Sequence, residues 1–280
     1  MKTIKDFIQR IQPHTLGTYE AELIGRLLPV NSWELIVSRY SFILEHAKGT
    51  QLLEVGCGNG LGLNYLLDHG VPKITGIDIS EHNLDAAKLL VGDRSQILKM
   101  DLHKMEFEDS TFETASCMQV TQYIDVKIFL NEMYRVLKPG GSLIIAMSNI
   151  LREDGLDPRS PGGTSYFTAM QMVDLTKKAG FFEPKVYAAF PLKIRSLPLF
   201  QKLYRKFYQA SIVVIYMVPG GKWLKNILRD KFLQRISVHE ISNKDIDQLS
   251  KKSQSVLLEQ KHWGTGEYEI INIVVNKDIL

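Results

Sequence analysis

The sequence predicts an α/β protein built on a doubly wound, mainly parallel sheet, and three observations support this prediction. Between residues 50 and 190, short apolar runs typical of buried strands alternate with helical patterns. The first such run, residues 52–55, leads into glycines at alternate positions: Gly56, Gly58, Gly60 and Gly62. The second run, residues 73–79, carries an acidic residue near its end, Asp78. Strand, glycine turn, helix and second strand together form a nucleotide-binding unit.

The spacing of the glycines excludes two common phosphate-binding motifs. A dinucleotide-binding turn needs G-x-G-x-x-G, and the three registers place Leu61, Leu63 or Tyr65 at the last glycine position. A P-loop is excluded because no Gly-Lys-Ser/Thr follows. What remains is an acidic residue, Glu54, followed by G-x-G-x-G with Cys57 and Asn59 between the glycines. Glycines at these positions allow the backbone to approach a ligand that lies across the turn.

Composition bounds the class of protein. The 280 residues suit one doubly wound domain with an elaboration, and 45% hydrophobic residues are enough for a sizeable core. The first ten residues lack the apolar stretch of a secretory signal. Cys57 and Cys117 provide neither a disulfide framework nor a zinc-ligand spacing. We therefore expect a reduced, cytoplasmic protein, and both monomer and homodimer remain open.

The remaining elements follow in order along the chain. Helices are expected over residues 18–28 and 32–46, and these form an N-terminal helical cap over residues 1–48. Later helices are expected from residue 64, over 81–90 behind the N-cap Ser80, from 130 to a Lys-Pro-Gly-Gly turn, and over 170–179. The expected strands cover residues 52–55, 73–79, 96–100, 114–120, 142–147, 184–189 and 268–275.

Four stretches taken together resemble the class I S-adenosylmethionine-dependent methyltransferases of type 11, the UbiE-like family. They are the glycine turn with Glu54, the acid Asp78, M-E-F-E-D-S-T-F-E at 105–113, and L-N-E-M-Y-R-V-L-K-P-G-G at 130–141. Met105-Glu106 replaces the Leu-Pro that is usual in the family. The resemblance covers residues 50–150 and implies a Rossmann-like sheet of seven strands, with N-terminal helices and a helical insertion between the last two strands. The last strand is expected to be antiparallel and next to the sixth.

The resemblance also assigns a cofactor site. S-adenosylmethionine is expected on the glycine turn, with S-adenosylhomocysteine as its product. The Asp78 carboxylate can accept two hydrogen bonds from a ribose diol, and Asp101 is expected to accept one from the adenine amino group while Leu102 packs on the ring. The expected cofactor residues are Glu54, Gly56, Cys57, Gly58, Asn59, Gly60, Asp78, Ile79, Asp101, Leu102 and Gln119.

Catalytic residues are harder to recognise, because methyl transfer from a sulfonium mainly requires orientation and exclusion of water. The candidates are His14 beside the cap helices, His262 before the last strand, and Tyr123 after the fourth strand. Leading helices in this family close over the cofactor, which makes Tyr19 and Tyr40 candidate neighbours of the cofactor or the acceptor. Core packing is an equal alternative for Tyr19 and the favoured explanation for Tyr40. The expected acceptor-site residues are Tyr19, Tyr123, Phe207 and Trp223. No histidines are spaced as metal ligands, so no metal is expected.

Residues 191–266 form the expected helical insertion, between a core over 49–190 and a last strand within 267–280. The segment 191–235 carries ten Lys and Arg residues against one acid, Asp230, together with apolar faces at helical spacing. Three explanations stay open: a lid over the acceptor, a membrane-surface segment that delivers a lipophilic acceptor, and nucleic-acid binding, which the apolar faces disfavour.

These observations lead us to expect a methyltransferase that acts on a small molecule, a natural product or lipophilic metabolite. Oxygen is the expected acceptor atom because it is frequent in the family. Two alternatives remain. One is an enzyme that uses the sulfonium charge for a cyclisation or elimination, and the other is a catalytically silent cofactor-binding subunit that stabilises a partner.

Overall fold

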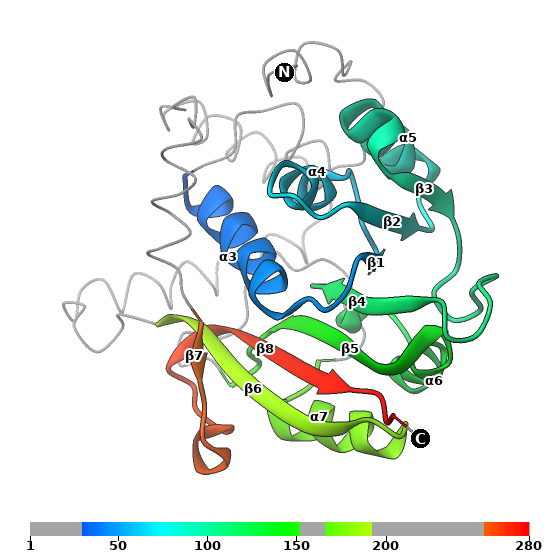
Figure 1. Ribbon diagram of the computed structural model, residues 1–280. Helices are drawn as coiled ribbons and strands as arrows, with labels where there is room; N and C mark the ends of the chain where they lie inside the picture. Colours follow the sequence, from blue (N-terminus) through cyan, green and yellow to red (C-terminus); the bar gives the residue numbers. More distant parts are fainter. Residues whose placement is uncertain (1–29, 152–165, 192–254, 280) are drawn as a thin grey trace, which may run out of the picture.

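The computed structural model describes residues 30–151, 166–191 and 255–279 (Figure 1). These residues form a mixed sheet of eight strands in the order β3-β2-β1-β4-β5-β8-β6-β7. The strands are β1 Gln51–Val55, β2 Lys73–Asp78, β3 Gln96–Lys99, β4 Phe112–Met118, β5 Leu137–Ser148, β6 Phe182–Pro191, β7 Val256–Leu257 and β8 Tyr268–Asn276. The α-helices are α3 Val30–His46, α4 Leu61–Asp68, α5 Glu81–Val91, α6 Val126–Val136 and α7 Ala169–Lys178. Short 3-10 turns follow at η2 Gly92–Arg94, η3 Thr121–Tyr123 and η5 Gln260–His262.

The sheet confirms the expected Rossmann-like topology and extends it by one strand. Strands β1 to β5 pair in parallel, and β8 lies antiparallel between β5 and β6, so the last strand is next to the sixth as expected. The eighth strand, β7, is a two-residue edge strand that pairs with Tyr187 and Ala188 of β6. It lies within residues 191–266, the range expected to form the helical insertion. Two residues are too few to show a strand period, so the sequence pattern could not predict β7.

Helices cover both faces of the sheet (Figure 1). On one face, α3, α4 and α5 pack through side chains such as Ile43, Leu66 and Leu84. On the other face, α6 and α7 pack through Phe129, Met133 and Met172. Because both faces are buried, the strands carry near-continuous apolar runs, and this is the reason that they could be recognised in the sequence.

Helix α3 confirms the second expected cap helix and shifts its start. The helix begins at Val30, two residues ahead of the expected start. Val37, Tyr40 and Ile43 are buried at helical spacing. The expected helix over 18–28 lies outside the described residues, as does most of the expected insertion, 192–254.

The Lys-Pro-Gly-Gly stretch differs from the expected simple turn. Helix α6 begins at Val126, behind the N-cap Asp125, and ends at Val136. Residues 137–141 already belong to β5, with a register shift against β4 between Phe112 and Thr114. Gly140 adopts a left-handed φ of 77°, and its N–H donates to the carbonyl oxygen of Lys277 at 3.0 Å. The sequence therefore forms a bulged strand start that is tied to the end of β8.

Candidate functional site

The glycine turn joins β1 to α4 at the carboxyl edge of the sheet. The structural requirement for glycine differs among Gly56, Gly58 and Gly60. All three adopt a left-handed φ, of 67° at Gly56, 53° at Gly58 and 79° at Gly60. A Cβ on Gly56 would lie 2.4 Å from the side chain of Val120, and one on Gly60 would lie 2.9 Å from the Cα of Ala87 in α5. A Cβ on Gly58 would meet no atom within 4 Å. Packing therefore requires Gly56 and Gly60, whereas Gly58 borders open space that a ligand can fill.

Asp78 ends β2 and holds this turn. One carboxylate oxygen accepts a hydrogen bond from the Gly58 N–H at 2.9 Å, and the other accepts from the Ser80 N–H at 2.9 Å. Ser80 caps α5, with its hydroxyl oxygen accepting from the Asn83 N–H, as the sequence indicated. The next residue along the chain, Ile79, is 69% exposed. The expected ribose acceptor thus lies beside Gly58, and an exposed apolar side chain follows it in the sequence.

Cys57 and Asn59 shape the turn through buried side chains. The side-chain oxygen Oδ1 of Asn59 accepts a hydrogen bond from the Leu61 N–H at 3.2 Å, at the start of α4. Burial raises the pKa of the Cys57 thiol well above its usual range, and it raises that of Cys117 to about 12. Both thiols are therefore protonated at neutral pH, in agreement with small buried fillers.

Glu54 lies at the carboxyl end of β1 and is completely buried. The hydroxyl of Tyr40, on α3, donates a hydrogen bond to Oε1 of Glu54. Among the described residues, Oε2 of Glu54 has no hydrogen-bond partner. Burial raises the pKa of Glu54 to about 8, and the nearby Asp78 carboxylate adds to this shift. The site therefore contains a neutral, half-satisfied carboxyl group at pH 7.

Asp101 follows β3 and is held by a histidine that sequence reasoning did not connect to it. Oδ1 of Asp101 accepts from the backbone N–H of His103 at 2.9 Å and from Nδ1 of its ring at 2.8 Å. The backbone N–H of Asp125, the N-cap of α6, donates to Nε2 of the same ring at 3.0 Å. These two contacts assign the proton of the neutral ring to Nδ1. Hydrogen bonds from His103 lower the pKa of Asp101, so its carboxylate is ionised and able to accept. Leu102, between them, is half-buried against the core.

Gln119 follows β4 in a strained backbone conformation. Its φ of 61° is left-handed, which is uncommon for a residue other than glycine. Its side-chain oxygen accepts from the Ser148 hydroxyl at 2.8 Å, and its Nε2 is buried with no partner among the described residues. Strain of this kind tends to occur at functional sites. This places an unpaired amide donor at the end of β4, at the same edge of the sheet as the glycine turn.

Of the other expected site residues, the structure describes Tyr123 and His262. Tyr123 lies in η3, one turn after Gln119, and is 47% exposed. His262 is exposed in η5, after the edge strand β7, and four strands separate β7 from β1. His14, Tyr19, Phe207 and Trp223 lie outside the described residues. The roles of these six residues stay predictions.

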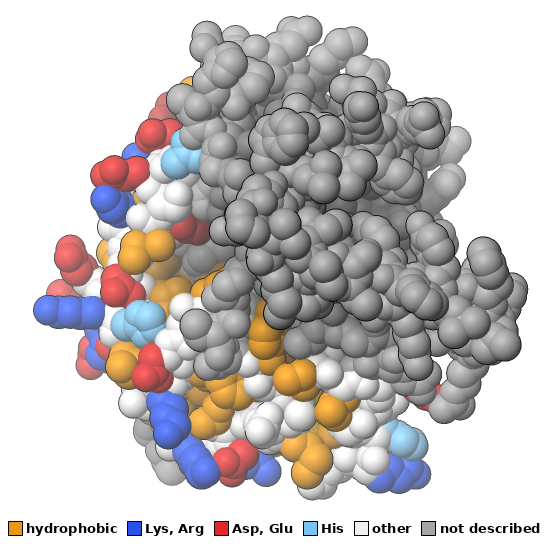
Figure 2. Space-filling view, turned by 180° about the vertical axis from the view of Figure 1, so that it is seen from behind, with side chains coloured by type: hydrophobic (Ala, Val, Ile, Leu, Met, Phe, Trp, Pro, Cys, Tyr) orange, Lys and Arg blue, Asp and Glu red, His pale blue; other side chains and the backbone are white. Residues whose placement is uncertain are grey.

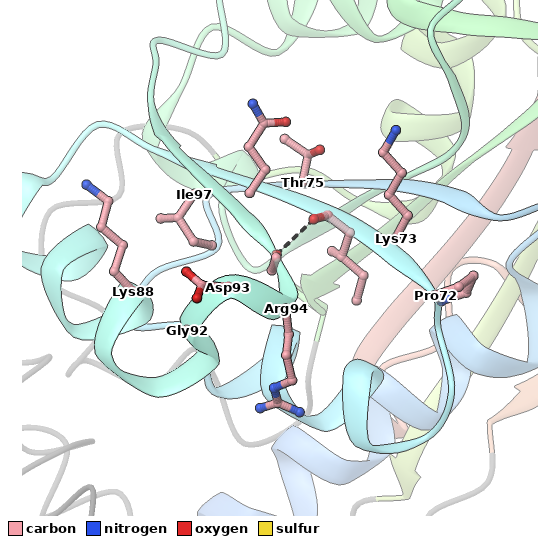
Figure 3. Close-up of a pocket in the computed structure, with 11 residues that line it drawn as sticks. Pro72, Lys73, Thr75, Lys88, Gly92, Asp93, Arg94 and Ile97 are labelled. Atoms are coloured by element: carbon pink, nitrogen blue, oxygen red, sulfur yellow. Dashed lines mark hydrogen bonds between the residues drawn. The ribbon is translucent and has the colours of Figure 1, made fainter.

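A groove of about 610 Å³ lies at the opposite, amino edge of β2 and β3 (Figure 3). Its lining includes Lys73, Lys88, Asp93 and Arg94. The Ser95 hydroxyl donates to the Ile74 carbonyl at 2.8 Å within it. Ligands of doubly wound sheets bind at the carboxyl edge, so this groove is not the expected cofactor site. The described residues contain no group of three metal-ligating side chains, and none of their helices is long and apolar enough to cross a bilayer.

Comparisons with known proteins agree with this geometry. Residues 53–145 match the family model described as methyltransferase domain. Sterol 4-C-methyltransferase strm-1 of Caenorhabditis elegans is 35% identical over 108 residues, which are 36% of this chain and 32% of the relative. Demethylmenaquinone methyltransferase of Listeria welshimeri is 29% identical over 193 residues, which are 62% of this chain and 75% of the relative. The chain spans less than two thirds of the length of the first curated relatives that it matches.

A solved structure shares the fold. Phosphoethanolamine N-methyltransferase 2 of Haemonchus contortus, in complex with S-adenosyl-L-methionine, superposes with a TM-score of 0.54 at 19% identity. The superposition covers 99% of this chain and 60% of the other. At this identity the likeness concerns the fold alone.

Proposed function

The chain belongs to the class I S-adenosylmethionine-dependent methyltransferases of type 11, and on this premise we propose that it methylates a lipophilic small molecule. The observation that carries the proposal is the glycine turn, where Gly58 borders open space and the Asp78 carboxylate lies next to it. The proposal concerns the activity and the acceptor of the whole protein.

The described residues fit the cofactor. The space next to Gly58 suits a ligand that lies close to the backbone, and the orphaned Oε2 of Glu54 can accept a hydrogen bond from a cationic group. Asp78 would hold the ribose, and Asp101 with Leu102 would hold the adenine. The bound cofactor supplies an electrophilic methyl group.

This chain contributes binding and orientation. Gln119 offers an unpaired amide donor at the end of β4, and Tyr123 offers an exposed phenol one turn later. Both can orient an acceptor at the carboxyl edge of the sheet. Oxygen is the acceptor atom that we propose, and a hydroxyl acceptor must also lose a proton. His14, His262 and Tyr123 are the candidate bases.

Exposed apolar side chains support a lipophilic acceptor. Hydrophobic side chains reach the surface in the view of Figure 2. Helices α6 and α7 begin at the carboxyl edge, and their first turns expose Ile128 and Met170; Leu151 is exposed beyond the end of β5. The relatives named above carry the names of sterol and menaquinone methyltransferases, which agrees with such an acceptor.

The basic segment 191–235 adds a second proposal, contact with a membrane surface through which a lipophilic acceptor arrives. Strand β6 runs parallel to β5 and ends at Pro191, so this segment leaves the sheet at the carboxyl edge. Phe207→Ala and Trp223→Ala, measured separately, distinguish this contact from a lid. Loss of sedimentation with anionic vesicles, together with salt sensitivity, supports membrane contact. Loss of turnover alone, with cofactor affinity intact, supports the lid.

Incubation with methyl-labelled S-adenosylmethionine and fractionated lipid extracts tests the function. We expect label in a lipophilic product whose mass has grown by one methyl group, and nuclear magnetic resonance of that product identifies the acceptor atom. A product of unchanged mass would favour cyclisation or elimination. Cofactor binding without any label uptake would favour the silent subunit and contradict the proposal.

A further inference from the structure

We infer that the buried pair of Glu54 and Tyr40 couples cofactor binding to the release of one proton: Glu54 is protonated in the free protein and ionised in the cofactor complex, and Tyr40 positions its carboxyl group. The inference rests on the proposed function, because it concerns the same site. It gives the first acid of the motif a measurable property beyond contact with the cofactor.

The position of Glu54 forces a choice between a neutral and a paired carboxyl group. Its backbone is in register with Gly76 of β2 and Ser116 of β4, so a neighbouring strand lies on each side of it. The side chain is completely buried, with one oxygen bound by Tyr40 and the other without a partner among the described residues. A buried carboxyl group that receives one hydrogen bond is unfavourable in its ionised form unless a cation lies beside it.

The charges around Glu54 favour the neutral form. Asp78, from β2, is a second acid that raises the pKa of Glu54. The thiols of Cys57 in the turn and Cys117 in β4 also interact with Glu54 and are protonated at neutral pH. Arg39 on α3 lowers the pKa of Tyr40. A cationic ligand on the glycine turn would supply the missing positive charge.

The ring of Tyr40 is fixed against α4, which suits a positioning residue. A Cβ on Gly62 of α4 would lie 1.7 Å from Cζ of Tyr40, so the ring occupies the space that this glycine leaves. The hydroxyls of Ser41 and Tyr65 form a buried hydrogen bond of 2.8 Å that ties α3 to α4. Burial raises the pKa of Tyr40 well above its usual range, so its hydroxyl keeps its proton and donates to Glu54.

Titration calorimetry of S-adenosylmethionine into the full chain tests the coupling, between pH 6 and 9 and in two buffers with different ionisation enthalpies. At pH 7 we expect nearly one proton to pass from the Glu54 carboxyl group to the buffer per ligand bound. The apparent affinity should rise about tenfold per pH unit and level off above about pH 8. The ligand's α-amino group titrates in the same range, so the measure is the difference between the wild-type protein and Glu54→Gln. That variant should lose the release and bind roughly tenfold to a hundredfold more weakly at high pH.

Tyr40→Phe tests the positioning role while keeping the ring in place. The hydrogen bond from Tyr40 lowers the pKa of Glu54, so its loss should move the midpoint of the affinity profile to higher pH. Tyr65→Phe, which removes a neighbouring hydroxyl that does not touch Glu54, is the matched control and should leave the midpoint unchanged. A purely structural role of Tyr40 would weaken binding equally at every pH and would overturn its assignment.

The outcomes separate this inference from the proposed function. Equal proton release in the wild-type protein and in Glu54→Gln, with tight cofactor binding in both, would overturn the coupling and leave the methyltransferase proposal intact. Absence of cofactor binding in the wild-type protein would overturn both. Release with S-adenosylhomocysteine as well supports the inference and assigns the partner charge to the amino group, whereas release with S-adenosylmethionine alone assigns it to the sulfonium.

Discussion

The two edges of the sheet differ in how their polar groups are satisfied. At the amino edge, the groove of Figure 3 is lined by charged side chains, and Arg94 forms an ion pair with Asp68 in which both side chains are about half exposed. At the carboxyl edge, Glu54 and Gln119 each bury a polar atom that has no partner among the described residues. Unsatisfied buried polar atoms cost free energy and persist where a ligand can satisfy them. Such atoms also occur elsewhere among the described residues, for example on Asn272 of β8, so they indicate the site only together with the glycine turn.

Glu54→Gln tests the carboxyl edge of the sheet through the dependence of stability on pH. The pKa of Glu54 is raised from its ordinary 4.5 to about 8, so its contribution to stability is complete below pH 4.5 and is lost as pH rises through 8. The loss is on the order of 5 kcal/mol. Denaturant unfolding of the wild-type protein and the variant at pH 5, 7 and 9 measures it. The wild-type protein should weaken toward alkaline pH relative to the variant, and parallel curves would contradict a buried neutral acid.

Substitutions at Gly60 and Gly58 separate packing from ligand contact within one turn. Gly60→Val places a side chain at a residue with a left-handed φ and in collision with the backbone of Ala87. The free energy of unfolding should therefore fall by roughly 3 kcal/mol. Gly58→Ala meets open space, so it should cost only about 1 kcal/mol for its φ while cofactor affinity falls at least about tenfold. Thermal unfolding and calorimetry measure the two quantities. Cofactor affinity unchanged in Gly58→Ala would move the ligand away from this turn.

Asp78→Asn should weaken cofactor binding roughly tenfold to a hundredfold, because an amide replaces the carboxyl group that lies beside Gly58. Calorimetry with S-adenosylmethionine measures the loss. Asp85→Asn, on the exposed side of α5, makes the same chemical change away from the site and should leave the affinity as it is. Equal effects of the two substitutions would indicate a general electrostatic effect instead of a specific contact.

Arg94→Ala tests the amino edge and should have the smallest effect. The ion pair with Asp68 is about half exposed, so solvent screening limits its contribution to less than about 1 kcal/mol. Cofactor affinity should not change, because the groove lies at the edge away from the glycine turn. A large loss of cofactor affinity in this variant would show that the two edges are not independent.

The strand, turn and helix at the expected cofactor site could be predicted from the sequence alone. Residues 52–55 are apolar because both faces of β1 are covered, and Gly56 and Gly60 are glycine because backbone geometry and close packing leave no other choice. Asp78 could be recognised because its position at the end of the second strand is a fixed feature of such units. These are local or periodic signals, and a single sequence displays them.

Which groups distant in the sequence lie together at the candidate site depends on tertiary packing. The contact of Tyr40 with Glu54 and the fit of the Tyr40 ring over Gly62 depend on how α3 packs on α4. The left-handed φ of Gln119 and the link from Asp101 through His103 to α6 leave no pattern in the chain. Periodicity reports which face of an element is buried, and it carries no information about the partner that covers that face. For this reason the sequence yields expected cofactor residues, whereas the burial of Glu54 and its hydrogen bond from Tyr40 follow only from the packed fold.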